Sequence, residues 1–290
     1  MMGNLKLYFK RLKRYIIEGI PIVRPQVSIL SPTEILKGRN ALITGGTSGI
    51  GYELAKAFIN AGAKVVITGR SQGRIDEACA KLSDETGLRN RAYGIVLDNT
   101  RISEFKERIN DILSILGKNN NLDILVNNAG VLGGHITNAT EDEYDKVLDT
   151  NLKGVFFLTK AVAEYMKENN VQGNILNIAS SSGVCPANSA YCVSKWGIRG
   201  LTEGYARSLA HLGIVVNGIA PGPTATPMLI NDTSDLSHGK VPLGRYALPE
   251  EIANMAVILV SNMGRTIVGD IVYMTGGAGN ITKENIRYYF

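Results

Sequence analysis

Tyr191, Lys195 and Ser180 have the types and the spacing of an acid–base site. Tyr191 and Lys195 are four residues apart, and the apolar residues that follow them predict a helix, so that the phenol and the ammonium share one face of it. A fixed positive charge beside a phenol favours the phenolate, which brings a group with an ordinary pKa of about 10 nearer to neutrality. Ser180 follows an apolar run that predicts a buried strand, and a hydroxyl at a strand end can donate a hydrogen bond to a substrate oxygen.

Other interpretations of these residues are open. A tyrosine and a lysine at this spacing also occur on solvated helix faces, where they have no catalytic part. Cys192, next to Tyr191, has the chemistry of a nucleophile, but no histidine is near it in sequence, which favours a small core side chain. The catalytic interpretation therefore depends on the rest of the chain.

Composition limits the classes of protein that the sequence allows. The chain has 290 residues, of which 44% are hydrophobic and 20% charged, and this favours one α/β domain with an extension. The net charge is +5, but residues 1–20 hold five cations and one glutamate, so they carry most of it. Because the remaining body is nearly neutral, no nucleic-acid partner is expected.

The cysteines and histidines predict neither a disulfide framework nor a metal site. Three scattered cysteines without a CxxC pair favour reduced thiols and a cytoplasmic protein. The histidines show no metal-ligand spacing, so no metal is expected. No apolar run reaches the roughly 18 residues that a membrane span needs, and no signal peptide is expected.

Residues 1–37 are predicted to be an extension and linker, before a domain at residues 38–290. Residues 5–20 form a basic amphipathic helix pattern, which favours either peripheral contact with an anionic membrane surface or packing against the body or a neighbouring subunit. Pro21, Pro25 and Pro32 then predict an extended connector.

From residue 39 onward, strand patterns alternate with helix patterns. This order predicts a single-domain α/β fold, a doubly wound Rossmann-type parallel sheet of about seven strands with helices on both faces. Strands are expected at residues 41–44, 64–68, 92–97, 123–126, 174–178, 213–219 and 267–274. Helices are expected at residues 53–60, 141–168, 189–212 and 249–261.

Residues 44–51, TGGTSGIG, lie between the first strand and the first helix, where a dinucleotide fingerprint belongs. Gly45 allows a tight turn, Gly49 lets the backbone approach a pyrophosphate, and Gly51 permits close packing of a helix whose N-terminus faces the negative charge. The residues assigned to the cofactor in this turn are Gly45, Thr47, Ser48, Gly49, Ile50 and Gly51.

The second strand ends in TGRS, which carries no acidic residue to accept ribose hydroxyls. Arg70 offers a guanidinium that can bind a 2′-phosphate, which favours NADP(H) over NAD(H). The alternative is an exposed arginine at the start of a loop.

Together these motifs resemble the short-chain dehydrogenase/reductase family, in its compact single-domain branch. The resemblance covers residues 38–277. It rests on TGGTSGIG, on Asp98, on NNAG at residues 127–130, on Asn151 within DTNLKG, on Ser180, on YCVSK at residues 191–195 and on APGPTATPM at residues 220–228.

The resemblance implies a role for each matching residue. Tyr191 exchanges a proton with the substrate oxygen that Ser180 holds, and Lys195 binds the nicotinamide ribose and lowers the pKa of the phenol. Asn151 holds a water that links Lys195 to solvent. The implied cofactor contacts beyond the glycine-rich turn and Arg70 are Asp98, Asn99, Asn128, Ala129, Gly130, Tyr191, Lys195, Pro221, Gly222, Thr224 and Thr226. The resemblance also implies a homo-oligomer, a dimer or tetramer, paired through the long helices at residues 141–168 and 189–212.

The implied reaction is hydride transfer between NADP(H) and a secondary alcohol or ketone. Ser180 lies eleven residues before Tyr191, slightly closer than the family pattern, which leaves Ser181 and Ser182 as substitutes. A catalytically silent nucleotide-binding regulator and a nucleotide-sugar epimerase or dehydratase are the alternatives. The substrate pocket is expected from residues 131–137, 184–190 and 224–246, with a lid in the polar run at residues 230–240, and acyl thioesters, sugars and sterols all suit this description.

Overall fold

A computed structural model describes residues 34–117, 120–229, 236, 238 and 240–279. The chain divides into two units, Met1–Ser31 and Pro32–Phe290, and all of the described residues belong to the second. The amphipathic pattern at residues 5–20 and most of the predicted lid lie outside the described residues. Within the described ranges, no helix is long and apolar enough to cross a membrane.

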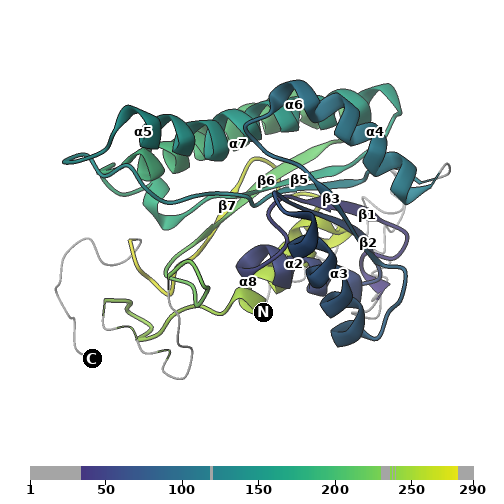
Figure 1. Ribbon diagram of the computed structural model, residues 1–290, viewed down its shortest axis with the longest axis horizontal. Helices are drawn as coiled ribbons and strands as arrows, with labels where there is room; N and C mark the ends of the chain where they lie inside the picture. Colours follow the sequence, from purple (N-terminus) through teal and green to yellow (C-terminus); the bar gives the residue numbers. More distant parts are fainter. Residues whose placement is uncertain (1–33, 118–119, 230–235, 237, 239, 280–290) are drawn as a thin grey trace, which may run out of the picture. The chain divides into compact units, whose positions relative to one another are not determined.

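A seven-stranded parallel sheet forms the centre of the described unit, in the order β3-β2-β1-β4-β5-β6-β7 (Figure 1). The order runs outward in both directions from β1 and β4, which confirms the predicted doubly wound fold. The strands are β1 (Asn40–Ile43), β2 (Lys64–Gly69), β3 (Ala92–Val96), β4 (Ile124–Asn127), β5 (Asn174–Ile178), β6 (Val215–Pro221) and β7 (Ile271–Met274).

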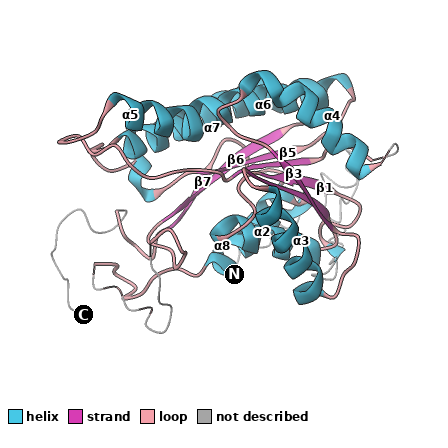
Figure 2. Ribbon diagram, viewed as in Figure 1, coloured by secondary structure: helices cyan, strands magenta, loops and turns pink. Residues whose placement is uncertain are grey.

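Helices cover both faces of this sheet (Figure 2). One face carries α2 (Gly49–Asn60), α3 (Gln72–Thr86) and α8 (Pro249–Val260). The other carries α4 (Phe105–Leu116), α5 (Glu141–Leu148), α6 (Gly154–Glu168) and α7 (Ala190–Leu209). With both faces covered, the central strands are buried throughout, which explains their continuous apolar sequences.

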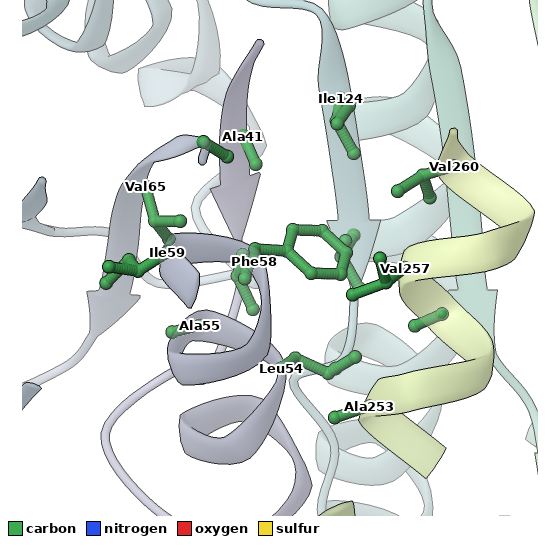
Figure 3. Packing of buried hydrophobic residues seen from close by; sticks show 14 of the residues in the cluster. Ala41, Leu54, Ala55, Phe58, Ile59, Val65, Ile124, Ala253, Val257 and Val260 are labelled. Atoms are coloured by element: carbon green, nitrogen blue, oxygen red, sulfur yellow. The ribbon is translucent and has the colours of Figure 1, made fainter. Parts of the chain in front are cut away.

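Successive residues of each central strand enter opposite cores. Ala41 and Ile43 of β1 pack toward α2 and α8, whereas Leu42 between them packs toward α4 and α6. In the first core, Phe58 of α2 is fully buried and lies between the sheet and Val257 of α8 (Figure 3). Full burial of such a side chain contributes about 1.5 to 3 kcal/mol, which fixes α2 on the sheet and its N-terminus at the end of β1.

The predicted elements are present, with differences at their ends. The helix predicted at residues 53–60 begins at Gly49. The sequence-based predictions gave no bounds for the helices α3 and α4. The strand predicted at residues 213–219 begins at Val215, because Gly213 adopts φ 73° and ends the preceding turn. The last strand is confined to Ile271–Met274, since residues before it form a turn whose amides bond to Gly264 and Val216.

The helix predicted at residues 141–168 is two helices. Between α5 and α6, residues Asp149–Lys153 form a π-helical turn. A π-turn holds one residue more than a regular turn, and such turns often occur at functional sites. This one carries Asn151.

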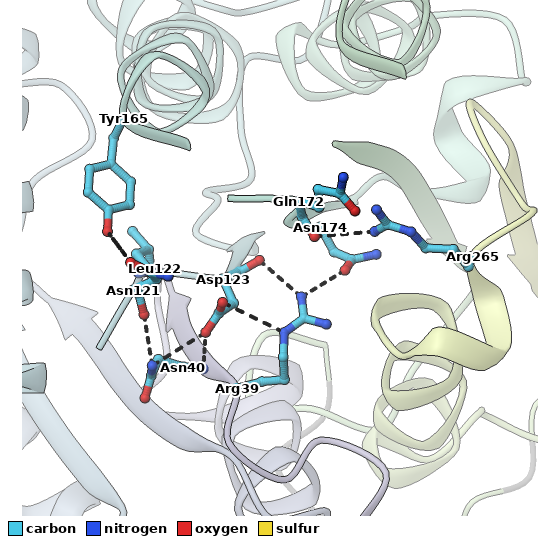
Figure 4. A network of polar contacts seen from close by, with 9 residues as sticks. All are labelled: Arg39, Asn40, Asn121, Leu122, Asp123, Tyr165, Gln172, Asn174 and Arg265. Carbon is cyan, nitrogen blue, oxygen red and sulfur yellow. Dashed lines mark hydrogen bonds and ion pairs between the residues drawn. The ribbon is translucent and has the colours of Figure 1, made fainter. Parts of the chain in front are cut away.

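A polar network joins the amino-terminal ends of the central strands (Figure 4). Asp123 accepts hydrogen bonds from the main-chain N of Asn40 at 2.8 Å and from its side-chain Nδ2 at 3.3 Å. Arg39 donates to Asn174 Oδ1 at 2.9 Å and lies 4.0 Å from Asp123. These bonds hold β1, β4 and β5 in register at the edge opposite the carboxyl ends.

Candidate active site

The predicted site residues come together at the carboxyl edge of the sheet. The glycine-rich turn follows β1, Arg70 follows β2, Asp98 follows β3, Asn128 follows β4 and Ser180 follows β5. Because all strands are parallel, their carboxyl ends share one edge, and the crevice there lies where the strand order reverses between β1 and β4. The topology therefore places the nucleotide motifs beside the acid–base residues.

The glycine-rich turn has the geometry of an anion cradle. Gly45 adopts φ 66°, a conformation that favours glycine, and a Cβ on Gly51 would collide with the Gly45 carbonyl oxygen. Ser48, the N-cap of α2, makes no side-chain capping bond. The amides of the first turn of α2 are therefore free of a side-chain acceptor from this cap, and with the helix dipole they suit a phosphate group.

Asn128 builds this turn from the neighbouring strand. Its Nδ2 donates to the carbonyl oxygens of Thr44 at 2.9 Å and Gly45 at 3.0 Å. The Thr44 hydroxyl in turn accepts from the main-chain amides of Asn128 and Ala129, each at 3.0 Å. The side-chain amide of Asn128 thus holds the glycine-rich turn in place, and its contact with the adenosine half stays a prediction.

Arg70 and Asp98 are neighbours on adjacent strand ends. Arg70 is exposed. Burial opposes ionisation of Asp98, but hydrogen bonds from Thr100 and the charges of Arg70 and Arg101 together lower its pKa. The structure thus places a cation and an ionised carboxylate at the end of the cradle where the adenosine half of a dinucleotide would lie.

Two further residues meet the predicted cofactor site. Asn99, which follows Asp98, is buried, and its Nδ2 is a donor without a hydrogen-bond partner among the described residues. Thr226 lies 3.5 Å from where a Cβ on Gly49 would stand, which brings the segment after β6 against the glycine-rich turn. These features fit a nicotinamide dinucleotide.

Hydrogen bonds anchor the segment after β6. Pro221 ends the strand, and the amide of Gly222 donates to Met274 O at 3.0 Å. The Thr224 hydroxyl donates to Gly222 O at 2.9 Å, and the Thr226 amide donates to Thr224 O at 2.8 Å. Both threonines are buried.

Ser180, Tyr191 and Lys195 converge between β5 and α7. Ser189 caps α7 by accepting a hydrogen bond from the Cys192 amide at 3.2 Å, which starts the helix just before Tyr191. The Ser180 side chain lies near enough to the Tyr191 phenol to lower its pKa. Lys195 is buried, lies with Nζ 5.6 Å from the centroid of the Tyr191 ring and donates to Ile178 O at 2.8 Å.

Ser180 is also distinguished from its two neighbours. Its hydroxyl accepts from the Ser182 amide at 3.1 Å and caps the short 3-10 helix Ser181–Gly183. A Cβ on Gly183 would stand 2.8 Å from Lys195 O, so this helix packs directly on α7. The short loop between Ser180 and Tyr191 therefore still brings the two side chains together.

Burial has the largest effect on the ionisation of the phenol. It raises the pKa of Tyr191, which the nearby Ser180 side chain lowers in part and Cys192 raises further. Burial also lowers the pKa of Lys195 to about 8. Lys195 is not among the groups that shift the phenol pKa in this geometry, where its ammonium bonds to Ile178 O, so its effect on that pKa stays a prediction.

Asn151 joins the π-turn to the loop after β4. Its Oδ1 accepts from the Val131 amide at 2.8 Å, and its Nδ2 donates to Val131 O at 2.9 Å and to Ser194 Oγ at 3.2 Å. Both amide hydrogens are therefore used within the protein. A relay water bound at Asn151 would have to donate its hydrogen bond to Oδ1 or to the main-chain oxygen of this residue.

Ser194 is a site residue that the sequence did not single out. It is fully buried, and its hydroxyl donates to Tyr191 O at 2.7 Å while accepting from Asn151. It therefore connects Asn151 with the backbone of the catalytic candidate. The only signal in the sequence was a small polar residue inside YCVSK, between Tyr191 and Lys195.

Comparison with known proteins agrees with this geometry. The family described as short chain dehydrogenase matches residues 39–237. The 3-oxoacyl-[acyl-carrier-protein] reductase FabG of Thermotoga maritima is 34% identical over 83% of this chain and 98% of its own length. The 3alpha-hydroxysteroid dehydrogenase of Mediterraneibacter gnavus is 34% identical over 84% of this chain and 98% of its own length.

Solved structures resemble the chain over a similar extent. A point variant of actinorhodin polyketide ketoreductase, solved with NADPH, has 32% sequence identity and a TM-score of 0.75, covering 84% of this chain and 98% of that one. Levodione reductase has 29% identity and a TM-score of 0.77, covering 85% and 100% of the two chains.

Proposed function

This chain belongs to the short-chain dehydrogenase/reductase family of NAD(P)-dependent oxidoreductases, and from this premise we propose that it reduces a ketone to a secondary alcohol with NADPH, with Tyr191 as the proton donor. The observation that carries the proposal is the convergence of Ser180, Tyr191 and Lys195 at the end of β5, beside the glycine-rich turn. When bound, the nicotinamide supplies hydride to the carbon of the carbonyl group.

The protein's own residues act on the carbonyl oxygen. Ser180 donates a hydrogen bond to this oxygen and polarises the C=O bond, and Tyr191 transfers its phenolic proton to it as the carbon–oxygen bond becomes a C–OH group. The ketone would thus gain one hydride from the bound cofactor and one proton from Tyr191. Lys195, tied to Ile178, holds a positive charge beside the phenol and stabilises the phenolate that remains.

The direction of the reaction depends on the protonation of Tyr191. Its pKa lies above the ordinary value, so the phenol is protonated at pH 7, which is the form that reduction of a ketone requires. Oxidation of an alcohol needs the phenolate as base, so the rate of oxidation would increase as the pH rises.

The preference for NADPH rests on the end of β2. Arg70 is exposed there, and the described residues Gly69 and Ser71 on either side of it carry no carboxylate to accept ribose hydroxyls. A guanidinium can bind a 2′-phosphate with charge-assisted hydrogen bonds. The NADPH in the ketoreductase structure named above is consistent with this preference.

A direct assay tests the proposal. Purified protein is mixed with NADPH or NADH and a panel of ketones, including a 3-oxoacyl thioester and a 3-oxosteroid, and loss of the reduced-nicotinamide absorbance is followed. We expect turnover with NADPH that Tyr191→Phe and Ser180→Ala each abolish. Tight NADPH binding without turnover on any ketone would instead support a regulatory nucleotide-binding protein.

A further inference from the structure

Five of the large apolar side chains that are exposed in the described residues follow the carboxyl ends of β4 and β6. They are Leu132, Ile136, Met228, Leu229 and Leu243. Ile136 is 72% exposed and Leu243 is 61% exposed, although the body of the domain offers abundant apolar burial. Exposed apolar side chains gathered near a candidate site indicate a ligand surface more often than chance exposure does.

Ile136 and Leu132 lie on a loop that is bonded directly to the start of α7. The Ile136 amide donates to Asn188 O at 2.9 Å, and the Ala190 amide donates to Gly134 O at 2.8 Å. Because Ala190 immediately precedes Tyr191, this loop forms one side of the approach to the phenol.

Leu243 reaches the other side of the site through the turn after β7. Its amide donates to Gly276 O at 3.0 Å, and its Cβ lies 3.2 Å from where a Cβ on Gly276 would stand. Farther along the same turn, Gly279 approaches Cys185, whose Sγ lies 3.5 Å from the corresponding position. Cys185 belongs to the loop that carries Ser180, so the turn after β7 contacts both Leu243 and the loop of the hydroxyl donor.

Met228 and Leu229 extend the surface on the cofactor side. The Leu229 amide donates to Thr226 O at 2.9 Å, and Thr226 packs near Gly49 of the glycine-rich turn. Both side chains are exposed. The apolar rim, formed by these five side chains, thus continues from the acid–base residues to the turn that holds the cofactor.

The described part of these walls carries few charged side chains. In the described parts of residues 131–137, 184–190 and 224–246, the lysine and arginine side chains are Lys240 and Arg245, and there is no aspartate or glutamate. Arg245 is paired with Glu251 through two bonds of 2.8 Å. A charged or heavily hydroxylated tail would lose water against the five apolar side chains without gaining a polar partner from them.

We infer that the substrate of this site is a ketone with an uncharged apolar tail, held between Ile136 and Leu132 on one side and Leu243, Met228 and Leu229 on the other. This inference rests on the proposed reductase function. The tail is recognised by burial of its methylene groups, and the carbonyl group by Ser180 and Tyr191. Sugars are thereby disfavoured among the substrates that the motifs alone allowed.

A homologous series of ketones tests the inference. Wild-type protein is assayed with NADPH and straight-chain methyl ketones, from butanone up to chains of about ten carbons. We expect kcat/KM to rise by about two- to fourfold for each added methylene until the rim is covered. Keto acids of equal length, with a carboxylate at the far end, should be poorer by at least about tenfold.

Substitutions in the apolar rim test whether the rim causes the dependence of kcat/KM on chain length. Ile136→Ser and Leu243→Ser should each lower the ratio of kcat/KM between the longest and the shortest ketone. Leu88→Ser is the matched control, because Leu88 is an exposed leucine next to the C-terminus of α3 and should leave this ratio unchanged. Thermal unfolding confirms that each variant is folded.

The outcomes separate the two proposals. If butanone is reduced but kcat/KM does not rise as the ketone chain lengthens, or if the keto acids are preferred, the inference is overturned and the reductase function stands. If no ketone of any length is reduced, calorimetric binding of the matching secondary alcohols with NADP⁺ reports the chain-length dependence instead. Affinity that is independent of chain length would overturn the inference in that case too.

Discussion

The ammonium of Lys195 donates a 2.8 Å hydrogen bond to the main-chain oxygen of Ile178, the last residue of β5. This bond fixes the lysine of α7 to the strand whose following loop carries Ser180. It also directs Nζ toward the sheet, so that its distance to the Tyr191 ring centroid is 5.6 Å. Lys195 therefore links α7 to the end of β5, in addition to the electrostatic role expected for its charge.

Replacing Tyr191 with phenylalanine tests the proton donor. The change removes the phenolic proton and keeps the ring, so we expect turnover to fall by about 100-fold or more while NADPH affinity changes little. Steady-state kinetics and fluorescence titration with NADPH measure the two effects. Tyr205→Phe is the control on the same helix: it removes a 2.8 Å bond to Phe156 O, at a cost of about 1 kcal/mol in stability, and leaves turnover unchanged. Turnover of Tyr191→Phe within about threefold of wild type would contradict the assignment.

Burial of Lys195 predicts a pH-dependent stability. Its pKa is about 8 in the folded protein and 10.5 ordinarily, so between these values the unfolded state binds a proton that the folded state lacks. Stability relative to Lys195→Met should therefore rise as the pH increases from about 8 to 10.5, by up to about 3 kcal/mol, and the cost of the buried charge is fully present below pH 8. Urea unfolding at several pH values measures the difference, and parallel curves for the two proteins would show that Lys195 is not desolvated.

Replacing Arg70 with alanine tests cofactor choice. The loss of a charge-assisted hydrogen bond to the 2′-phosphate should weaken NADPH binding by about 1.5 to 3 kcal/mol and leave NADH binding nearly unchanged. Arg101→Ala is the matched control, because Arg101 also acts on Asp98 but is paired with Glu104 at 3.2 Å. Equal losses for both cofactors in Arg70→Ala would remove Arg70 from 2′-phosphate recognition.

The network at the amino edge of the sheet predicts a graded loss of stability. Asp123→Ala removes the acceptor of the Asn40 amide and leaves Arg39 without its carboxylate, so we expect a loss of about 2 to 4 kcal/mol. Asp123→Asn keeps an oxygen that can accept from Asn40 and should cost about 1 kcal/mol. Urea unfolding of the two variants compares them, and equal losses would show that the charge rather than the hydrogen bond matters.

An exposed aromatic group on α6 and α7 predicts self-association. Phe156 contacts Phe157 edge-on, with ring centroids 5.1 Å apart, and lies 5.8 Å from the Tyr205 ring, yet both phenylalanines are partly exposed. Such a patch is typical of an interface. We expect a dimer or tetramer by light scattering at micromolar concentration, and a smaller species for Phe156→Glu but not for the control Leu88→Glu. A wild-type monomer would refute the prediction.

Local patterns in the sequence determined the class of fold and most of the site. The alternation of strands and helices, the glycine-rich turn after β1 and the residues at strand ends are encoded over a few positions, because backbone conformation and burial of a parallel strand impose a short period. For this reason β5, predicted at residues 174–178, was found with those bounds, and Ser180, Tyr191 and Lys195 were found together.

Tertiary structure alone decided what those residues contact. The pairing of β1 with β4 brings Asn128 to the Thr44 and Gly45 carbonyls, and the π-turn brings Asn151 to Val131, and both contacts join residues far apart in the chain. The pKa of Tyr191 depends on desolvation by every group packed around the phenol, whereas sequence spacing reports only the neighbouring lysine. The apolar rim likewise required the three-dimensional fold, since exposure of Ile136 and Leu243 is a property of the packed chain.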